Sequence, residues 1–354
     1  MKQTFEIKHF GDIPLNDPFF DSLKKDYQEF AEWYKRKISE QAQAYVQYTD
    51  EKLTGFMYLK PEIGEVIDVT PPLPNGKRIK IGTLKVDAHG TRLGERLIKK
   101  AFDRAIVDRA DEIYITVFPH HKRLIEMLEE FGFRSEGNIK NTPNGKENVL
   151  VKSFNPQSLT GNLRKDYPLI DIRRVNFYLL AIRPEWHSQL FPDSILKTES
   201  YDLLSDISHT NSISKNYICS MDGVENLHPR DLVVVYRMTD SLGPAEYRSV
   251  ATSLCTVEEM RTRNSFKDVN EYLKYVQPYS VFGEKELRQW WNRKILYIVK
   301  LLYSAAFTKR VIRKTLAEEI GLDRKNRWGF LPLSQEQFLK IADSGGIDVR
   351  LIIR

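Results

Sequence analysis

Cysteine is scarce in this chain, and long apolar runs are absent. The 354 residues include two cysteines, Cys219 and Cys255, which lie too far apart for a metal knuckle and are expected to be reduced core thiols. No spacing of residues indicates a metal site. No stretch approaches the roughly 18–20 uninterrupted apolar residues of a membrane helix, and the first residues lack the apolar core of a signal peptide. We therefore expect a cytoplasmic protein that does not enter a membrane.

The overall composition is that of a globular protein with a modest preference for anions. Hydrophobic residues make up 41% of the chain, charged residues make up 29%, and the formal net charge is +6. A chain of this length has room for two domains. The positive charge favours an anionic partner, and a coenzyme, RNA or a membrane surface would each satisfy it.

The first 155 residues alternate between strand and helix patterns. Helical periodicity begins at Asp17-Pro18 and continues to Tyr34, and it returns at residues 94–106 and 121–130, with Gly132 placed to end the last helix. Residues 61–77, which contain four prolines and two glycines, read as a loop. Strands are expected at residues 5–13, 42–48, 53–59, 79–86, 113–118, 133–139 and 147–154. This order predicts an α/β domain, a mixed sheet flanked by helices.

The pattern changes after residues 156–166, which have the composition of a linker. Residues 295–303 fit either a strand or a buried helix. Short strands are expected at residues 176–182, 215–220, 232–236 and 247–257, and helices at 265–276, 284–291 and 310–320. The chain therefore divides into a domain at 1–155, a linker at 156–166 and a second domain at 167–354. We expect the second domain to be α+β with a small β-barrel.

A strand, a glycine-containing loop and a helix follow one another between Ile79 and Ile106. The first N–H groups of a helix have no intrahelical partner, and the helix dipole adds partial positive charge there. Gly90 and Gly94 would let a phosphate approach the backbone closely. The segment therefore predicts an anion site, although an ordinary strand-to-helix turn would use the same glycines.

The loop His89-Gly-Thr-Arg-Leu-Gly94 resembles the pyrophosphate-binding signature of the GNAT acetyltransferase superfamily. His89 stands where the family has Arg or Gln, Arg92 stands where it has the first glycine, and Gly94 matches the second. A later segment is also similar, because His121 occupies the position of the family's Asn and Gly132-Phe133 matches its Gly-Phe pair. The resemblance covers residues 1–155 and implies an N-acetyltransferase that uses acetyl-CoA.

The same resemblance implies which residues hold the coenzyme. Backbone groups of Leu84 and Val86 would pair with the pantetheine arm as an added strand. Backbone N–H groups of the loop would hold the diphosphate, and Arg92 and Arg96 would add charge-assisted contacts. The remaining implied coenzyme contacts are His89, Gly90, Thr91, Leu93, Gly94, Glu95 and His121.

The catalytic residues are not assigned by this resemblance. The family often uses a tyrosine of the second helix as the acid that protonates the leaving thiolate, and Leu128 stands at that position here. His120 and His121 are either proton shuttles or residues of the helix start and the coenzyme site. The other candidates for acid and base are Tyr114, Glu62, Glu65 and Asp87.

The second domain resembles the PUA-like, ASCH-type superfamily. The resemblance rests on residues 228–236, where a His-Pro-Arg-Asp turn precedes a buried strand, and on the strand at 247–257. Arg230 stands where the family has glycine. Domains of this kind bind RNA or modified bases, so the resemblance implies an RNA partner.

A basic and aromatic stretch gives separate support for an RNA partner. Residues 285–314 contain nine Lys or Arg and a single acid, Glu286. Bases stack on aromatic rings while cations contact phosphates. The aromatic residues either serve this purpose or belong to the core; they are Trp290, Trp291, Tyr297, Tyr303 and Phe307.

Three functions are therefore compatible with the sequence. The first is an acetyl-CoA-dependent N-acetyltransferase whose acceptor is an RNA-linked amine, for example on tRNA, or a ribosome-associated protein. The second is a non-catalytic RNA-binding or regulatory protein that senses acetyl-CoA. The third is an acetyltransferase for small molecules or proteins whose second domain only binds protein. The sequence does not indicate the oligomeric state.

Overall fold

The computed structural model describes residues 3–87, 93–191 and 212–354. Contacts divide the chain into two compact units, Met1–Asp166 and Tyr167–Arg354. His89, Gly90, Thr91 and Arg92, which the sequence places in the coenzyme loop, lie outside the described residues. Within the described ranges, no helix has both the length and the apolar character needed to cross a membrane.

The N-terminal unit is built on a seven-stranded sheet with the order β1-β2-β3-β4-β5-β7-β6. Neighbouring strands are antiparallel except β4 and β5, which run parallel. Asp50 and Glu51 have positive φ in the tight turn between the second and third strands, at the turn expected from the sequence. The strands are β1 (Gln3–His9), β2 (Gln43–Thr49), β3 (Lys52–Val66), β4 (Leu73–Val86), β5 (Glu112–Val117), β6 (Arg134–Thr142) and β7 (Gly145–Ser153).

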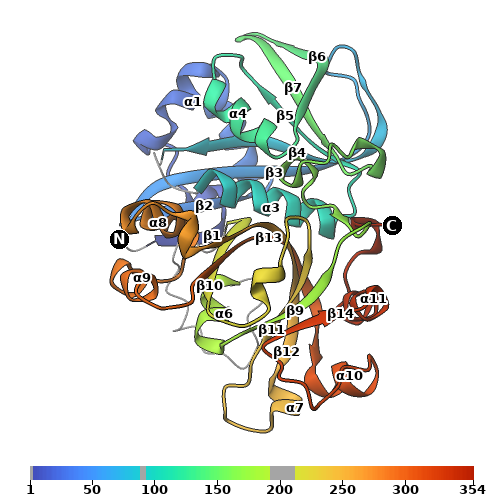
Figure 1. The fold of residues 1–354 in the computed structure, drawn as a ribbon. Coiled ribbons are helices and arrows are strands. Elements are labelled where there is room, and N and C mark those ends of the chain that lie inside the picture. Colours follow the sequence, from blue (N-terminus) through green and yellow to red (C-terminus); the bar gives the residue numbers. More distant parts are fainter. Residues whose placement is uncertain (1–2, 88–92, 192–211) are drawn as a thin grey trace. The chain divides into compact units, whose positions relative to one another are not determined.

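The helices of this unit are α1 (Asp21–Asp26), α2 (Phe30–Ser39), α3 (Leu93–Val107), α4 (Lys122–Glu130) and α5 (Leu163–Asp166). α3 packs on β3 and β4 (Figure 1). The prediction of one helix from Asp17 to Tyr34 is wrong, because the helix breaks at Tyr27. The Tyr27 hydroxyl donates to Glu147 at 2.5 Å and its ring lies 5.1 Å from that of Phe118, so the residue is held toward the sheet in an extended conformation.

The prediction of a loop at residues 61–77 is confirmed only for residues 67–72, because residues 61–66 and 73–77 belong to β3 and β4. β3 and β4 continue through this segment as a long hairpin, in which Pro61 lies opposite Ile79. The register shifts between Tyr58 and Leu59 and again between Gly64 and Val66, so irregular positions accommodate the proline and glycine residues. Most β3 residues beyond Leu59 are at least partly exposed, which explains why the segment lacks the apolar pattern of a strand.

The C-terminal unit contains a six-stranded sheet with the order β10-β13-β12-β11-β9-β14. β9 and β11 are parallel, and the other neighbours are antiparallel. The ambiguous residues 295–303 belong to a strand. The strands are β9 (Phe177–Ile182), β10 (Ser214–Cys219), β11 (Leu232–Arg237), β12 (Val250–Thr262), β13 (Tyr297–Ile312) and β14 (Phe330–Leu333), and a separate pair is formed by β8 (Ile170–Asp171) and β15 (Ile352–Ile353).

The α-helices in the described part of this unit are α6 (Pro184–Leu190), α7 (Ala245–Arg248), α8 (Val269–Val276), α9 (Glu284–Trp291), α10 (Arg313–Glu318) and α11 (Gln335–Ser344). Arg230 adopts φ 81°, a conformation that glycine accepts more easily. It stands at the position where the ASCH-type superfamily has glycine. Cys219 and Cys255 are buried free thiols, as the sequence predicts.

The expected barrel is not found in the described part of the C-terminal unit. β10 and β14 end the sheet without pairing to each other there. Side chains of β11 alternate between two apolar clusters: Val234 lies in one with Leu316 of α10 and Phe338 of α11, and Val233 lies in the other with Leu190 of α6. Because apolar residues from helices cover both faces, the sheet buries its side chains without closing on itself.

The buried face next to α6 also contains a polar residue, His187. Its side chain is fully buried, and its Nε2 lies 2.8 Å from the Thr252 hydroxyl. Burial, together with the charges of Arg237 and Arg310, lowers the pKa of His187 from 6.5 to about 3. The folded C-terminal unit therefore holds this imidazole neutral at physiological pH.

Acidification is expected to destabilise the C-terminal unit through His187. Between pH 6.5 and 3 the unfolded chain binds more protons at this residue than the folded chain, so stability falls as the pH decreases. We expect the wild type to lose about 2 kcal/mol more than His187→Gln between pH 7 and pH 5. Urea unfolding followed by tryptophan fluorescence measures this difference, and parallel pH profiles for the two proteins would contradict it.

Candidate functional site

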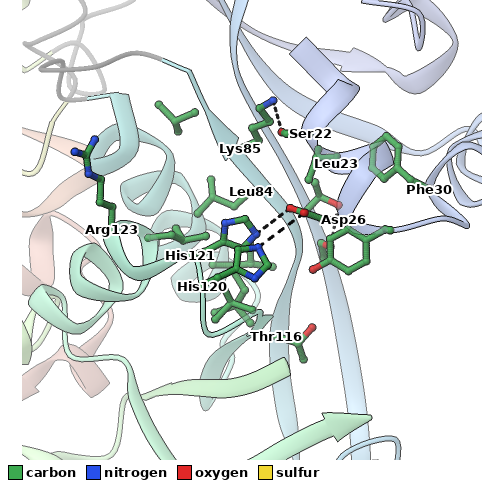
Figure 2. Close-up of a pocket in the computed structure, with 18 of the residues that line it drawn as sticks. Ser22, Leu23, Asp26, Phe30, Leu84, Lys85, Thr116, His120, His121 and Arg123 are labelled. Atoms are coloured by element: carbon green, nitrogen blue, oxygen red, sulfur yellow. Dashed lines mark hydrogen bonds and ion pairs between the residues drawn. The ribbon is translucent and has the colours of Figure 1, made fainter. Parts of the chain in front are cut away.

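β4 and β5 pair only as far as Ile81 and Ile115, and a pocket opens where this pairing ends. The pocket has a volume of about 920 Å³. Residues 81–87 of β4 and the turn after it form one wall, residues 115–117 of β5 form another, and α1, α2 and the start of α4 complete the lining (Figure 2). The edge of β4 that faces this pocket has no strand partner among the described residues.

A β-bulge lies in the pocket wall at Gly82. Tyr58 of β3 lies opposite Thr83 and Leu59 lies opposite Ile81, so Gly82 is an extra residue in β4. A Cβ atom on Gly82 would lie 2.9 Å from a ring carbon of Tyr58, which explains the glycine. The bulge interrupts the ladder with β3 and leaves backbone groups available to a ligand in the pocket.

Apolar and basic groups share the remaining lining. Leu84 and Leu124 contribute aliphatic surface, and Lys122 and Arg123 contribute cationic groups at the start of α4. Lys85 lies at the other wall, where its ammonium group donates to the Ser22 hydroxyl at 2.7 Å. The pocket therefore suits an elongated ligand with amide and apolar portions and an anionic end.

Two histidines of the pocket converge on one carboxylate. Asp26, the last residue of α1, lies 3.1 Å from Nε2 of His121 and 3.8 Å from Nε2 of His120 (Figure 2). Partial burial and the neighbouring His120 lower the pKa of His121, and Asp26 opposes this shift. The side chain of His121 is 36% exposed and that of His120 is 61% exposed, so the cluster remains accessible from the pocket.

Tyr27, the residue after Asp26, also lines the pocket, and its hydroxyl already has a hydrogen-bond partner. Its hydroxyl donates to Glu147 of β7, and burial together with this carboxylate raises its pKa far above the ordinary value. The segment after α1 is further tied to the turn between β6 and β7, since the Asn144 amide donates to Glu29 at 2.7 Å. This side of the pocket is therefore held in place by side-chain hydrogen bonds.

The residues that the sequence assigns to the coenzyme have different positions in the structure. Leu84, Val86, Gly94 and His121 line the pocket. Leu93 and Glu95 are buried in the first turn of α3 and do not belong to the lining. The other four assigned residues fall in the range 88–92, which is not described.

The expected phosphate contact of Arg96 is wrong. Its side chain is 1% exposed, donates to Gln47 of β2 at 2.8 Å and lies over the ring of Phe5 at 4.3 Å. Arg96 lies on the face of α3 that packs against the sheet. The apolar spacing of the helix did not show that this arginine belongs to the buried face and not to the end of the helix next to the loop. Its guanidinium is therefore a structural group of the N-terminal unit.

Some of the residues considered as catalytic acid or base line the pocket and others do not. Asp87 lines the pocket. Glu62, Glu65 and Tyr114 do not line it, and Tyr114 instead donates its hydroxyl to Glu62. Leu128 is fully buried in α4 and does not line the pocket.

Asp26 and Tyr27 were not identified from the sequence. They precede the histidines of the pocket by more than 90 residues, and no local spacing links the two segments. The packing of α1 and α2 in an apolar cluster with β2 and β3 brings them to the same wall.

The basic and aromatic stretch of the C-terminal unit is divided between core and surface. Tyr303 and Phe307 are 1% and 2% exposed and belong to the apolar clusters, so they do not stack on bases. Trp290 and Trp291 are half-buried, and the guanidinium of Arg293 lies 3.7 Å from the Trp290 ring. Within residues 285–314 the exposed cations are Lys285, Arg288, Arg293, Lys294 and Lys309.

Comparisons with known proteins show low similarity only. No family model and no curated protein matches the sequence. An ASCH structure from Zymomonas mobilis is 10% identical, with a TM-score of 0.33, over 47% of this chain and 94% of its own.

Two acetyltransferase structures show a similar level of likeness. A GNAT family acetyltransferase from Elizabethkingia anophelis with acetyl-CoA bound is 12% identical, with a TM-score of 0.31, over 43% of this chain and 98% of its own. An N-acetyltransferase from Staphylococcus aureus is 11% identical, with a TM-score of 0.34, over 43% of this chain and 99% of its own. At these values the likenesses assign no activity to this chain.

Proposed function

We propose that this protein is an acetyl-CoA-dependent N-acetyltransferase. The observation that supports this proposal is the pocket between β4 and β5, where a strand edge without a partner adjoins a β-bulge at Gly82. A pantetheine arm carries two amides, which can hydrogen-bond to the strand edge at Leu84 and Val86 as an added strand would. The anionic end of the coenzyme then lies toward the start of α3, where Gly94 lines the pocket and the first backbone N–H groups of a helix have no intrahelical partner.

The chemistry requires an acceptor amine to reach the thioester at the opposite end of the arm. The amine nitrogen attacks the thioester carbonyl carbon, the C–S bond breaks, the amine loses a proton and CoA leaves as the thiol. The pocket wall at α1 and α2 faces this end, and Tyr27, Phe30 and Trp33 give it aromatic surface. An amine attached to a larger acceptor would therefore enter beside these rings.

The acceptor in this proposal is an amine on RNA, such as a tRNA-linked amine, or on a ribosome-associated protein, and the site of action is the cytoplasm. The C-terminal unit acts as an RNA reader. Its exposed cations at α9 and the following turn support this assignment: Lys285, Arg288, Arg293 and Lys294. They are able to neutralise phosphates without losing any core contact.

Transfer of a radiolabelled acetyl group tests the proposal. The full chain is incubated with labelled acetyl-CoA and, separately, with total RNA, aminoacyl-tRNA and ribosomal protein, and the label in each acceptor is counted. We expect label in at least one of these acceptors. Absence of label from all of them, although acetyl-CoA binds, would overturn the transferase proposal.

A non-catalytic sensor of acetyl-CoA that binds RNA is the alternative. Two observations favour it: Leu128 replaces the usual tyrosine, and the hydroxyl of Tyr27 is held by Glu147. Neither side chain offers a free phenol to the leaving thiolate. Binding of acetyl-CoA without turnover in the assay above is the result expected for such a sensor.

A further inference from the structure

The cluster of Asp26, His120 and His121 has the composition and geometry of a metal-binding group. One donor atom from each residue lies within 4.8 Å of the other two. A metal ion with ligands at about 2.1 Å separates its tetrahedral donors by about 3.4 Å. Nε2 of His121 lies 3.1 Å from one carboxylate oxygen of Asp26 and Nε2 of His120 lies 3.8 Å from the other, so the three side chains are already close to the spacing that a shared ion requires.

The surroundings of this cluster favour a cation. Asp26 forms ion pairs only with the two histidines among the described residues, and no lysine or arginine there neutralises it. The carboxylates of Glu29 and Glu147 lie nearby, since both act on Tyr27 together with Asp26. Negative charge in a partly buried wall is stabilised more strongly by a divalent ion than by a neutral imidazole.

We propose that Asp26, His120 and His121 bind a divalent transition-metal ion of the zinc class in the wall of the pocket. Two imidazole nitrogens and one carboxylate oxygen suit Zn²⁺ and its neighbours in the transition series, whereas Mg²⁺ prefers oxygen ligands alone. Three protein ligands leave a coordination position open, and all three residues line the pocket (Figure 2). The ion would therefore meet whatever molecule occupies the pocket.

This inference goes beyond the proposed acetyl transfer and does not depend on it. The three ligands are in place without the coenzyme, and none of them belongs to the undescribed part of the loop after β4. The site would make the pocket sensitive to zinc, whether the pocket transfers an acetyl group or only senses acetyl-CoA.

Calorimetric titration of the full chain with zinc chloride, without coenzyme, tests the site. We expect one ion per chain and at least a tenfold loss of affinity in His120→Ala and in Asp26→Asn. His120→Ala is the safer variant for folding, because its side chain is 61% exposed. Magnesium chloride should produce no saturable heat.

His228→Ala is the matched control. His228 lies 3.8 Å from the Asp231 carboxylate, so it forms a similar histidine–aspartate pair, but among the described residues no second histidine joins it in a metal-binding group. The control should bind zinc with the affinity of the wild type. Either no saturable zinc binding by the wild type or an unchanged affinity in His120→Ala would overturn the proposal and leave the cluster as an ion pair only.

Discussion

Thr116→Trp is expected to abolish acetyl-CoA binding. Thr116 is half-buried in β5 and lines the pocket beyond the last residues that pair with β4 (Figure 2). An indole at this position occupies the space assigned to the pantetheine arm, while tryptophan is well accepted in strands. We expect the affinity for acetyl-CoA to fall by at least about 100-fold, equivalent to about 2.7 kcal/mol, as measured by calorimetry.

Thr4→Trp provides the control for this variant. Thr4 is also a half-buried strand threonine of the N-terminal unit, but it lies in the edge strand β1 and outside the pocket. Its affinity for acetyl-CoA should equal that of the wild type. Equal affinities for Thr116→Trp and the wild type would show that the coenzyme binds somewhere else.

Gly132→Ala is expected to destabilise the N-terminal unit strongly. Gly132 follows α4 with φ 80°, and a Cβ atom would lie 2.1 Å from the carbonyl oxygen of Lys165. The left-handed conformation costs alanine roughly 1–2 kcal/mol, and the displacement of α5 adds roughly 1–3 kcal/mol. We expect a loss of about 3 kcal/mol or more in urea unfolding followed by circular dichroism.

Gly137→Ala separates the two causes. Gly137 has φ 89°, and nothing lies within 4 Å of the position that a Cβ atom would take. This variant should lose only the conformational cost, roughly 1–2 kcal/mol. If Gly132→Ala loses no more than Gly137→Ala, the close contact with Lys165 does not contribute.

Local patterns in the sequence predicted much of the N-terminal unit. The strand and the helix expected on either side of the glycine loop are β4 and α3. Gly132, which follows α4, has the positive φ that its position predicts. These features depend on residues that are close in sequence. Periodicity and capping residues are therefore sufficient to find them.

Features that depend on distant residues were not predictable in this way. The break at Tyr27 requires Glu147, which is 120 residues away, and the cluster on Asp26 requires two histidines from the start of α4. Arg96 has the sequence position of a phosphate ligand, yet it is buried against Gln47 of β2. Similarly, helices cover both faces of the sheet in the described part of the C-terminal unit, and the sheet does not close there. The pattern of a single strand does not predict this arrangement.

Diffraction from crystals of the full chain grown with acetyl-CoA tests the central claim most directly. The account predicts density for the pantetheine arm along β4 from Gly82 to Val86, with the thioester toward α1 and α2 and the diphosphate toward the start of α3. An empty pocket in crystals that hold acetyl-CoA elsewhere, or no bound coenzyme at saturating concentration, would contradict it.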